Sequence, residues 1–70
     1  MKINNSKEFG AFIRKKRKEL GYTQAYLSEF SGLSSSFISD VENGKSTVEL
    51  EKVLFLTSLL GLDVNITSRG

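Results

Sequence analysis

Hydrophobic positions recur with the spacing of an α-helix in four successive stretches of the chain, and residues typical of helix ends separate the stretches. The predicted helices span about residues 7–20, 24–30, 35–43 and a fourth that runs from a cap at Ser46 or Thr47 to about Leu60. The expected N-caps of the first three are Asn5, Thr23 and Ser34, and Glu8 follows Asn5 at the spacing of a capping box. The pattern therefore predicts an all-α fold of four short helices.

The apolar faces of these stretches predict one shared core. Its expected members are Phe9, Phe12, Ile13, Leu20, Leu27, Phe30, Leu33, Ile38, Val41, Leu50, Val53, Leu54, Leu56, Thr57 and Leu60. Phe37 has two interpretations, a core residue or a contact to a thymine methyl group. Phe55 and Leu59 fall on the opposite side of the fourth helix, and a chain of 70 residues is too small to cover that second face alone. We therefore expect a partner to bury them.

After Gly61 the hydrophobic period changes from helical to alternating, because Leu62, Val64 and Ile66 are separated by polar residues. This pattern predicts a short, half-buried β-strand with no partner strand in the same chain. We expect it to pair with the same strand of a second copy across a two-fold axis, so the protein is predicted to be a homodimer. A frayed tail and strand addition to a different protein are the alternatives. The expected division is a compact domain over residues 1–61 and a dimerisation strand and tail over residues 62–70.

The amino-acid composition excludes several classes of chemical site. The chain has no Cys and no His, which excludes disulfides, zinc sites with thiolate or imidazole ligands, and His-based catalytic triads. The serine cluster at residues 34–36 has no base beside it, so we expect no enzymatic activity and no cofactor. We also expect no metal, because Asp40, Glu42, Glu49 and Glu51 do not follow the spacing of a calcium loop. No apolar run is long enough for a membrane span, which predicts a cytoplasmic protein with no membrane partner.

Charge is distributed unevenly along the chain. Residues 1–24 hold seven Lys and Arg against two Glu, whereas residues 25–70 hold three against six acidic residues. A basic first half is typical of a protein that faces a polyanion. A merely solvated lysine face is the plain alternative. A membrane-surface role is disfavoured because the core needs the apolar face of the first helix.

Residues 23–45, TQAYLSEFSGLSSSFISDVENGK, have the pattern of a helix-turn-helix motif. Two short helices flank a turn with a glycine, and each constrained position carries a suitable residue. These positions are Leu27, the small Ser28 at the helix crossing, Gly32 in the turn, and Leu33, Ile38 and Val41 on the apolar side. The second helix of such a motif presents its polar face to the DNA major groove.

Over residues 10–61 the chain resembles the lambda-repressor-like, or XRE, helix-turn-helix regulators. The resemblance rests on Ile13-Arg14, Arg17, residues 21–24, Leu27, residues 31–34, Ile38-Ser39 and residues 42–45. Within that family it is similar to short antitoxin-type regulators like HipB, in which a C-terminal strand pairs between subunits. Ser28 and Ser31 depart from the common Ala and apolar residues, which predicts slightly looser packing.

The resemblance implies roles for individual residues. Phosphate contacts are expected at Arg14, Thr23, Gln24, Asn43 and Lys45. An ion pair is expected between Arg17 and Glu42, as a structural link between the first and third helices. A dimer interface is expected to include Phe55, Leu59, Leu62, Val64 and Ile66.

The polar side of the third helix is the expected base-reading face, formed by Ser34, Ser35, Ser36, Ser39 and Asp40. Serine hydroxyls bind almost any base edge, so specificity per contact should be modest. Asp40 has two interpretations, an acceptor for a cytosine amino group or a partner of a neighbouring basic side chain.

Together these features predict a dimeric, sequence-specific repressor that binds a palindromic operator in double-stranded DNA. Two interpretations of its biological setting remain open. One is an antitoxin that represses its own operon and also binds a HipA-like toxin kinase. The other is a stand-alone repressor of phage or operon type, with no toxin partner.

Overall fold

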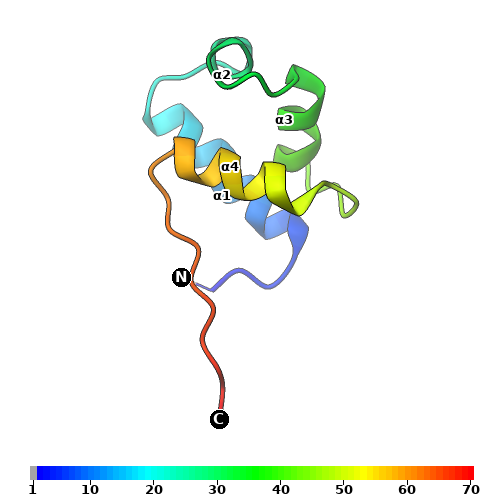
Figure 1. Ribbon diagram of the computed structural model, residues 1–70, viewed down its shortest axis with the longest axis vertical. Coiled ribbons are helices and arrows are strands. Elements are labelled where there is room, and N and C mark those ends of the chain that lie inside the picture. Colours follow the sequence, from blue (N-terminus) through cyan, green and yellow to red (C-terminus); the bar gives the residue numbers. More distant parts are fainter. Residues whose placement is uncertain (1) are drawn as a thin grey trace.

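Four α-helices account for most of residues 2–70, the part of the chain that the computed structural model describes (Figure 1). They are α1 (Ser6–Glu19), α2 (Gln24–Ser31), α3 (Ser35–Glu42) and α4 (Leu50–Leu59). The first three begin as the sequence predicts, since the side chains of Asn5, Thr23 and Ser34 accept hydrogen bonds from backbone N–H groups in the first turns. The predicted all-α fold of four helices is therefore confirmed.

The start of α4 differs from the prediction. Ser46 and Thr47 lie in a turn, and the helix begins at Leu50 without a side-chain cap. The reason is that residues 43–49 are needed to cross from α3 to α4, with Val48 packed against the core on the way. Leu50 and Leu54 are exposed rather than buried, contrary to the prediction, because the arc of α4 that faces the core is narrower than expected and is filled by Val53, Leu56, Thr57 and Leu60.

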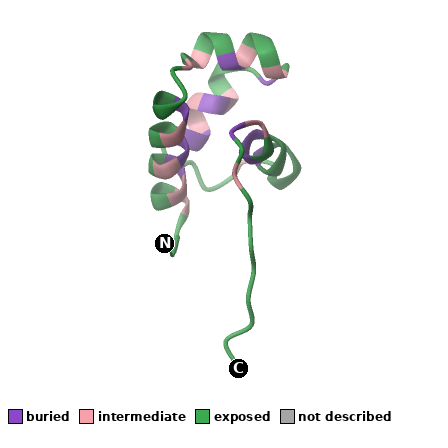
Figure 2. Cartoon of the chain, turned by 90° about the vertical axis from the view of Figure 1, so that its left-hand side faces the viewer, coloured by how far each residue is buried: buried purple, intermediate pink, exposed green. Residues whose placement is uncertain are grey.

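The core lies where the inner faces of the four helices meet (Figure 2). Its buried apolar residues are Ile13, Leu27, Leu33, Ile38, Val41, Val53, Leu56 and Leu60. Phe37 is partly buried and packs against this cluster, which agrees with the core interpretation of that residue. All eight buried positions belong to the predicted set, so the helical periodicity identified the centre of the fold correctly.

Phe30 and Leu20 are exposed, although the sequence pattern predicts them in the core. The position of α2 that faces the core is filled by Leu27, which is fully buried. Phe30 instead stacks on Tyr26 with 6.1 Å between ring centroids, and Tyr26 lies 5.3 Å from Tyr22. The three rings thus form a row that begins at the half-buried Tyr22 before α2 and continues along the exposed side of α2, where each ring shields its neighbours from part of the solvent.

Helices α1 and α3 approach each other closely because two glycines have no side chain. A Cβ atom at Gly10 would lie 2.1 Å from the carbonyl oxygen of Val41, so no larger residue fits without a shift of the backbone. Gly44 has φ of 81° and packs its backbone on Lys7, and the hydroxyl of Ser6 donates to the Gly44 carbonyl at 2.9 Å. The N-terminal end of α1 is therefore joined to the loop that follows α3.

Residues 62–70 leave the helices as an extended segment (Figure 1). Leu62 packs partly against the core, while Val64 and Ile66 are exposed. The segment forms no strand within residues 2–70, since nothing in the described chain pairs with it. The predicted strand requires a second chain and stays a prediction.

Candidate nucleic-acid interface

The turn between α2 and α3 is held by a set of short hydrogen bonds. Gly32 takes the left-handed conformation, with φ of 79°, and its N–H donates to the Ser28 carbonyl at 2.9 Å. The Ser28 hydroxyl donates to the Leu33 carbonyl at 2.6 Å, and the Leu33 N–H donates to the Ser31 hydroxyl at 3.0 Å. The looser packing at these serines stays a prediction, while their hydroxyls bond the turn and so help to orient α3.

The polar side of α3 carries the expected base-reading residues. Ser34, Ser35 and Ser36 are exposed at its N-terminal end, and Ser39 and Asp40 are half-buried further along. The Ser34 oxygen caps the helix by accepting from the Phe37 N–H at 3.0 Å, while its own proton remains free to donate. Ser35 and Ser36 are accessible to a ligand, so hydroxyl donors and acceptors cluster at the N-terminal end of α3.

Asp40 contacts Lys45, with 3.4 Å between its carboxylate Oδ2 and the Lys45 Nζ atom. Both side chains are about half exposed, at 44% and 54%, so solvent weakens the attraction. This geometry agrees with the second interpretation of Asp40, in which it bonds a neighbouring basic residue. At the same time it gives Lys45 an internal partner, which the predicted phosphate contact of Lys45 would have to displace.

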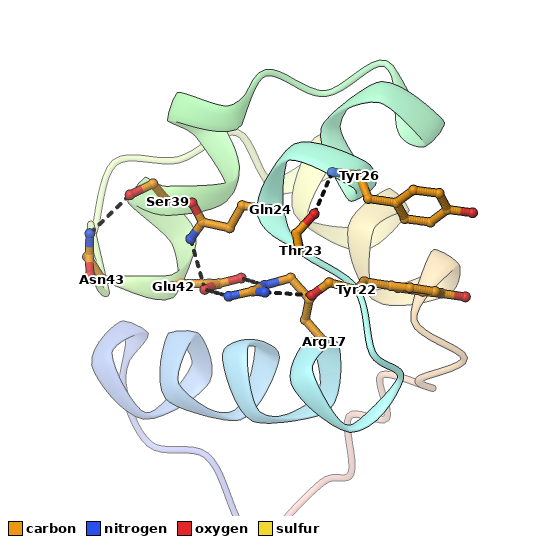
Figure 3. A network of polar contacts seen from close by, with 8 residues as sticks. All are labelled: Arg17, Tyr22, Thr23, Gln24, Tyr26, Ser39, Glu42 and Asn43. Carbon is orange, nitrogen blue, oxygen red and sulfur yellow. Dashed lines mark hydrogen bonds and ion pairs between the residues drawn. The ribbon is translucent and has the colours of Figure 1, made fainter.

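A buried network connects three elements behind this face (Figure 3). Arg17 donates from Nε to Glu42 at 2.6 Å and from Nη2 at 3.0 Å, and its Nη1 donates to the Tyr22 carbonyl at 2.7 Å. Only 7% of Arg17 and 8% of Glu42 is exposed, so the pair is shielded from water. The hydrogen bonds that Arg17 donates to the Glu42 carboxylate raise the pKa of Arg17, although burial opposes the shift. A raised arginine pKa keeps the guanidinium charged throughout the physiological range.

Gln24 is drawn into the same network. Its side-chain Nε2 donates to the second oxygen of Glu42 at 3.1 Å, rather than pointing freely into solvent as the phosphate prediction implies (Figure 3). One N–H of the Gln24 amide therefore has an acceptor within the chain, and the second N–H remains available to a ligand. The backbone N–H groups of Gln24 and Ala25 precede the first intrahelical bond of α2 and make this helix end attractive to an anion.

Four of the five expected phosphate-binding residues lie at two separate ends of the motif, and the fifth, Arg14, lies on α1. Thr23 and Gln24 stand at the start of α2, whereas Asn43 stands beyond α3, where its side-chain amide donates to Ser39 at 3.3 Å (Figure 3). The Thr23 hydroxyl accepts from the Tyr26 N–H at 3.0 Å and fixes the first of these ends. Arg14 is exposed on α1 and forms no ion pair within residues 2–70.

The predicted dimer residues lie on α4 and on the segment after it. Phe55 is 45% exposed and Ile66 is 94% exposed, whereas Leu59 and Leu62 are half-buried. Val64 is also exposed. These five residues do not form one packed cluster in a single chain, because the segment after Gly61 leaves the helices.

Two types of residue were missed by sequence reasoning. Gly10 brings α1 against α3, and its signal was available, since a glycine inside a helix costs about 1 kcal/mol and usually has a packing reason. The hydrogen bonds of Ser28 and Ser31 had no such signal, because they depend on the geometry of the turn. Among residues 2–70, no group of acidic side chains could hold a metal ion, and no helix is long and apolar enough to cross a membrane.

Comparison with known proteins agrees with this geometry. A family model described as Helix-turn-helix matches residues 13–66. The uncharacterized HTH-type transcriptional regulator y4mF of Sinorhizobium fredii is 35% identical over 69 residues, which cover 99% of this chain and 91% of that protein. The ImmF control region 10 kDa protein of Bacillus phage phi105 is 32% identical over 62 residues, which cover 89% of this chain and 69% of that protein.

Solved structures share the same arrangement of helices. A HipB-O4 20mer complex matches with a TM-score of 0.87 at 21% identity and covers 100% of this chain and 99% of the matched one. A HipA-HipB-O2-O3 complex matches equally well, with a TM-score of 0.87, 21% identity and the same coverage of both chains. At this level of identity the similarity demonstrates the fold alone.

Proposed function

The chain belongs to the helix-turn-helix family of XRE-type regulators. On that basis we propose that it is a transcriptional repressor that binds double-stranded DNA at a specific sequence. The observation that carries the proposal is the exposed hydroxyl face of α3. Ser35 and Ser36 lie at the N-terminal end of a helix whose direction is fixed by the turn before it. Helices of this kind place their N-terminal residues against base edges in the major groove.

The base contacts in this proposal are made by Ser34, Ser35, Ser36, Ser39 and Asp40. The phosphate contacts are made by Arg14, Thr23, Gln24, Asn43 and Lys45. The two groups have different tasks, because phosphate contacts set register and most of the affinity, whereas base contacts carry the sequence preference. Asp40 and Lys45 must separate at least in part if both are to reach DNA, since they contact each other in the free protein.

We further propose that the protein acts as a homodimer on a palindromic operator. The interface comprises Phe55 and Leu59 of α4 with Leu62, Val64 and Ile66 of the following segment. Support comes from the exposed apolar side chains in this half of the chain and from the unpaired extended backbone after Gly61. A two-fold dimer presents two α3 helices to half-sites about one helical turn apart.

The partner proposal has two forms. Similarity to the HipA-HipB-O2-O3 complex supports an antitoxin that represses its own operon and binds a HipA-like toxin kinase, by analogy of fold. Similarity to the ImmF control region protein of a phage supports a stand-alone repressor instead. Copurification from the source cell separates the two, because a stoichiometric kinase supports the antitoxin form and a homodimer alone supports the stand-alone form.

Selection from a pool of randomised DNA duplexes tests the proposal as a whole. The expected result is enrichment of a palindromic motif, with an affinity that falls steeply as salt rises. A Gln24→Ala variant should weaken binding to all sequences equally and still select the same motif. Absence of any enriched motif, or preferred binding of single-stranded RNA, would overturn the proposal.

A further inference from the structure

The first turn of α1 lies directly beside the loop that follows α3. Gly44 contacts Lys7 so closely that an added Cβ at Gly44 would lie 2.7 Å from the Lys7 Cα and 3.2 Å from its Cβ. The bond from Ser6 to the Gly44 carbonyl closes the same contact at 2.9 Å. The root of the Lys7 side chain is therefore held next to Asn43 and Lys45, although 36 or more residues separate them in sequence.

Lys7 shares one side of α1 with two further cations. At about 100° per residue, Lys7, Arg14 and Lys18 fall within an arc of about 40°. Gly10 and Arg17, which contact α3 and Glu42, border that arc. The three cations, here called the α1 rim, therefore run along the edge of α1 that borders the helix-turn-helix motif, over about 16 Å of helix.

The cations of the α1 rim have fewer bonding partners than Lys45 and Asn43, the expected phosphate contacts at the end of α3. Lys45 contacts Asp40 at 3.4 Å, and the amide of Asn43 donates to Ser39 at 3.3 Å. Lys7, Arg14 and Lys18 are exposed and form no ion pair within the described part of the chain. A cation without a competing carboxylate gains more from an approaching phosphate.

From this geometry we propose that the α1 rim is a third phosphate-binding element, with Lys7 as the main cationic contact beside the end of α3. Lys7 and Lys18 extend the phosphate contacts beyond Arg14 and beyond the two ends of the motif. The inference rests on the proposed DNA-binding function and extends the contacts of α1 with the DNA backbone from Arg14 to Lys7 and Lys18. The rim contributes affinity and no sequence preference, because phosphates carry no sequence information.

The test uses the full-length protein and a mixed-sequence DNA duplex, with fluorescence anisotropy measured over a series of salt concentrations. Lys7→Ala should lower affinity roughly three- to tenfold near 0.1 M salt and reduce the salt slope by about 1 per protomer. Lys18→Ala should act in the same direction, and Lys7→Arg should retain wild-type affinity. Lys15→Ala is the matched control, because Lys15 is exposed and lies about 80° around α1 from Lys7.

Several outcomes would overturn the inference. If Lys7→Ala and Lys15→Ala lose affinity equally, the effect is one of net charge and the rim has no special place. If Lys7→Ala has the affinity of the wild type, and the wild type binds duplex DNA with a steep salt slope, the proposal for the α1 rim is refuted while the proposed function stands. If wild type binds no duplex at any salt concentration, the proposed function and the rim fail together. A melting curve for each variant shows that the fold is intact.

Discussion

In the first half of the chain, helices α1, α2 and α3 are linked by buried polar contacts within one copy, whereas in the second half the segment that follows α4 has no partner strand within residues 2–70. In the first half, Arg17 and Glu42 are buried with all their polar atoms bonded, and serine hydroxyls close the turn. In the second half, Phe55 and Ile66 remain exposed and the backbone after Gly61 is unpaired. The buried polar contacts hold the first half together within one copy, and the unpaired backbone of the second half supports the proposed association.

Removal of the segment after Gly61 should have the largest effect, which is on self-association. A chain that ends at Gly61 loses Leu62, Val64 and Ile66, so self-association should fall about a hundredfold or more while the helices persist. Analytical ultracentrifugation measures the association, and circular dichroism measures the helices. A chain that ends at Thr67 is the matched control and should remain dimeric. A dimer that survives truncation at Gly61 would refute the role given to the segment.

In the first half, loss of one partner from the buried ion pair should destabilise the fold most. Glu42→Ala leaves the Arg17 guanidinium buried without its carboxylate, which should lower the free energy of unfolding by about 3–5 kcal/mol. Urea denaturation measures the change. Asp40→Ala breaks an exposed pair and serves as the control, with an expected cost of at most about 1 kcal/mol. Equal costs at the two sites would show that burial of the pair is not decisive.

A methyl group placed in the close contact between α1 and α3 should lower the free energy of unfolding by a smaller amount. Gly10→Ala places a methyl group against the Val41 carbonyl, which should cost about 1–3 kcal/mol even though Ala favours helix formation. Ala11→Gly, at the next and exposed position, should cost about 1 kcal/mol or less through helix propensity alone. Thermal melting of both variants checks the comparison. A stabilised Gly10→Ala variant would contradict the close approach.

Removal of the Asp40 carboxylate, which pairs with Lys45 at the end of α3, should have the smallest effect. It should strengthen DNA binding, whereas the changes above weaken association or folding. Asp40→Asn removes a carboxylate near the phosphates and frees Lys45, so affinity for mixed-sequence duplex should rise by about two- to fivefold. Glu51→Gln on α4 changes the net charge equally and serves as the control. Anisotropy titration measures both variants. Equal gains would assign the effect to net charge rather than to Lys45.

The sequence predicts the two halves with different success, for a physical reason. Periodicity and capping residues located Ile13, Leu27 and Ile38 in the core because these signals are local. The pattern predicts the cap of α4 at Ser46 or Thr47, whereas the residue at the cap is Glu49, because a good capping residue also suits a turn. The contact of Gln24 with Glu42 depends on three elements meeting, which no local pattern records. The strand after Gly61 depends on a second chain, so a single copy leaves it untested.

The central claim is that the hydroxyl face of α3 reads base edges, and one ratio tests it most directly. The ratio is the dissociation constant for a mixed-sequence duplex divided by that for the selected operator. In the Ser35→Ala and Ser36→Ala variants this ratio should change by about 5- to 30-fold, which corresponds to about 1–2 kcal/mol, while binding to mixed-sequence duplex stays near wild type. Equal losses on both duplexes, with the ratio unchanged, would contradict the claim.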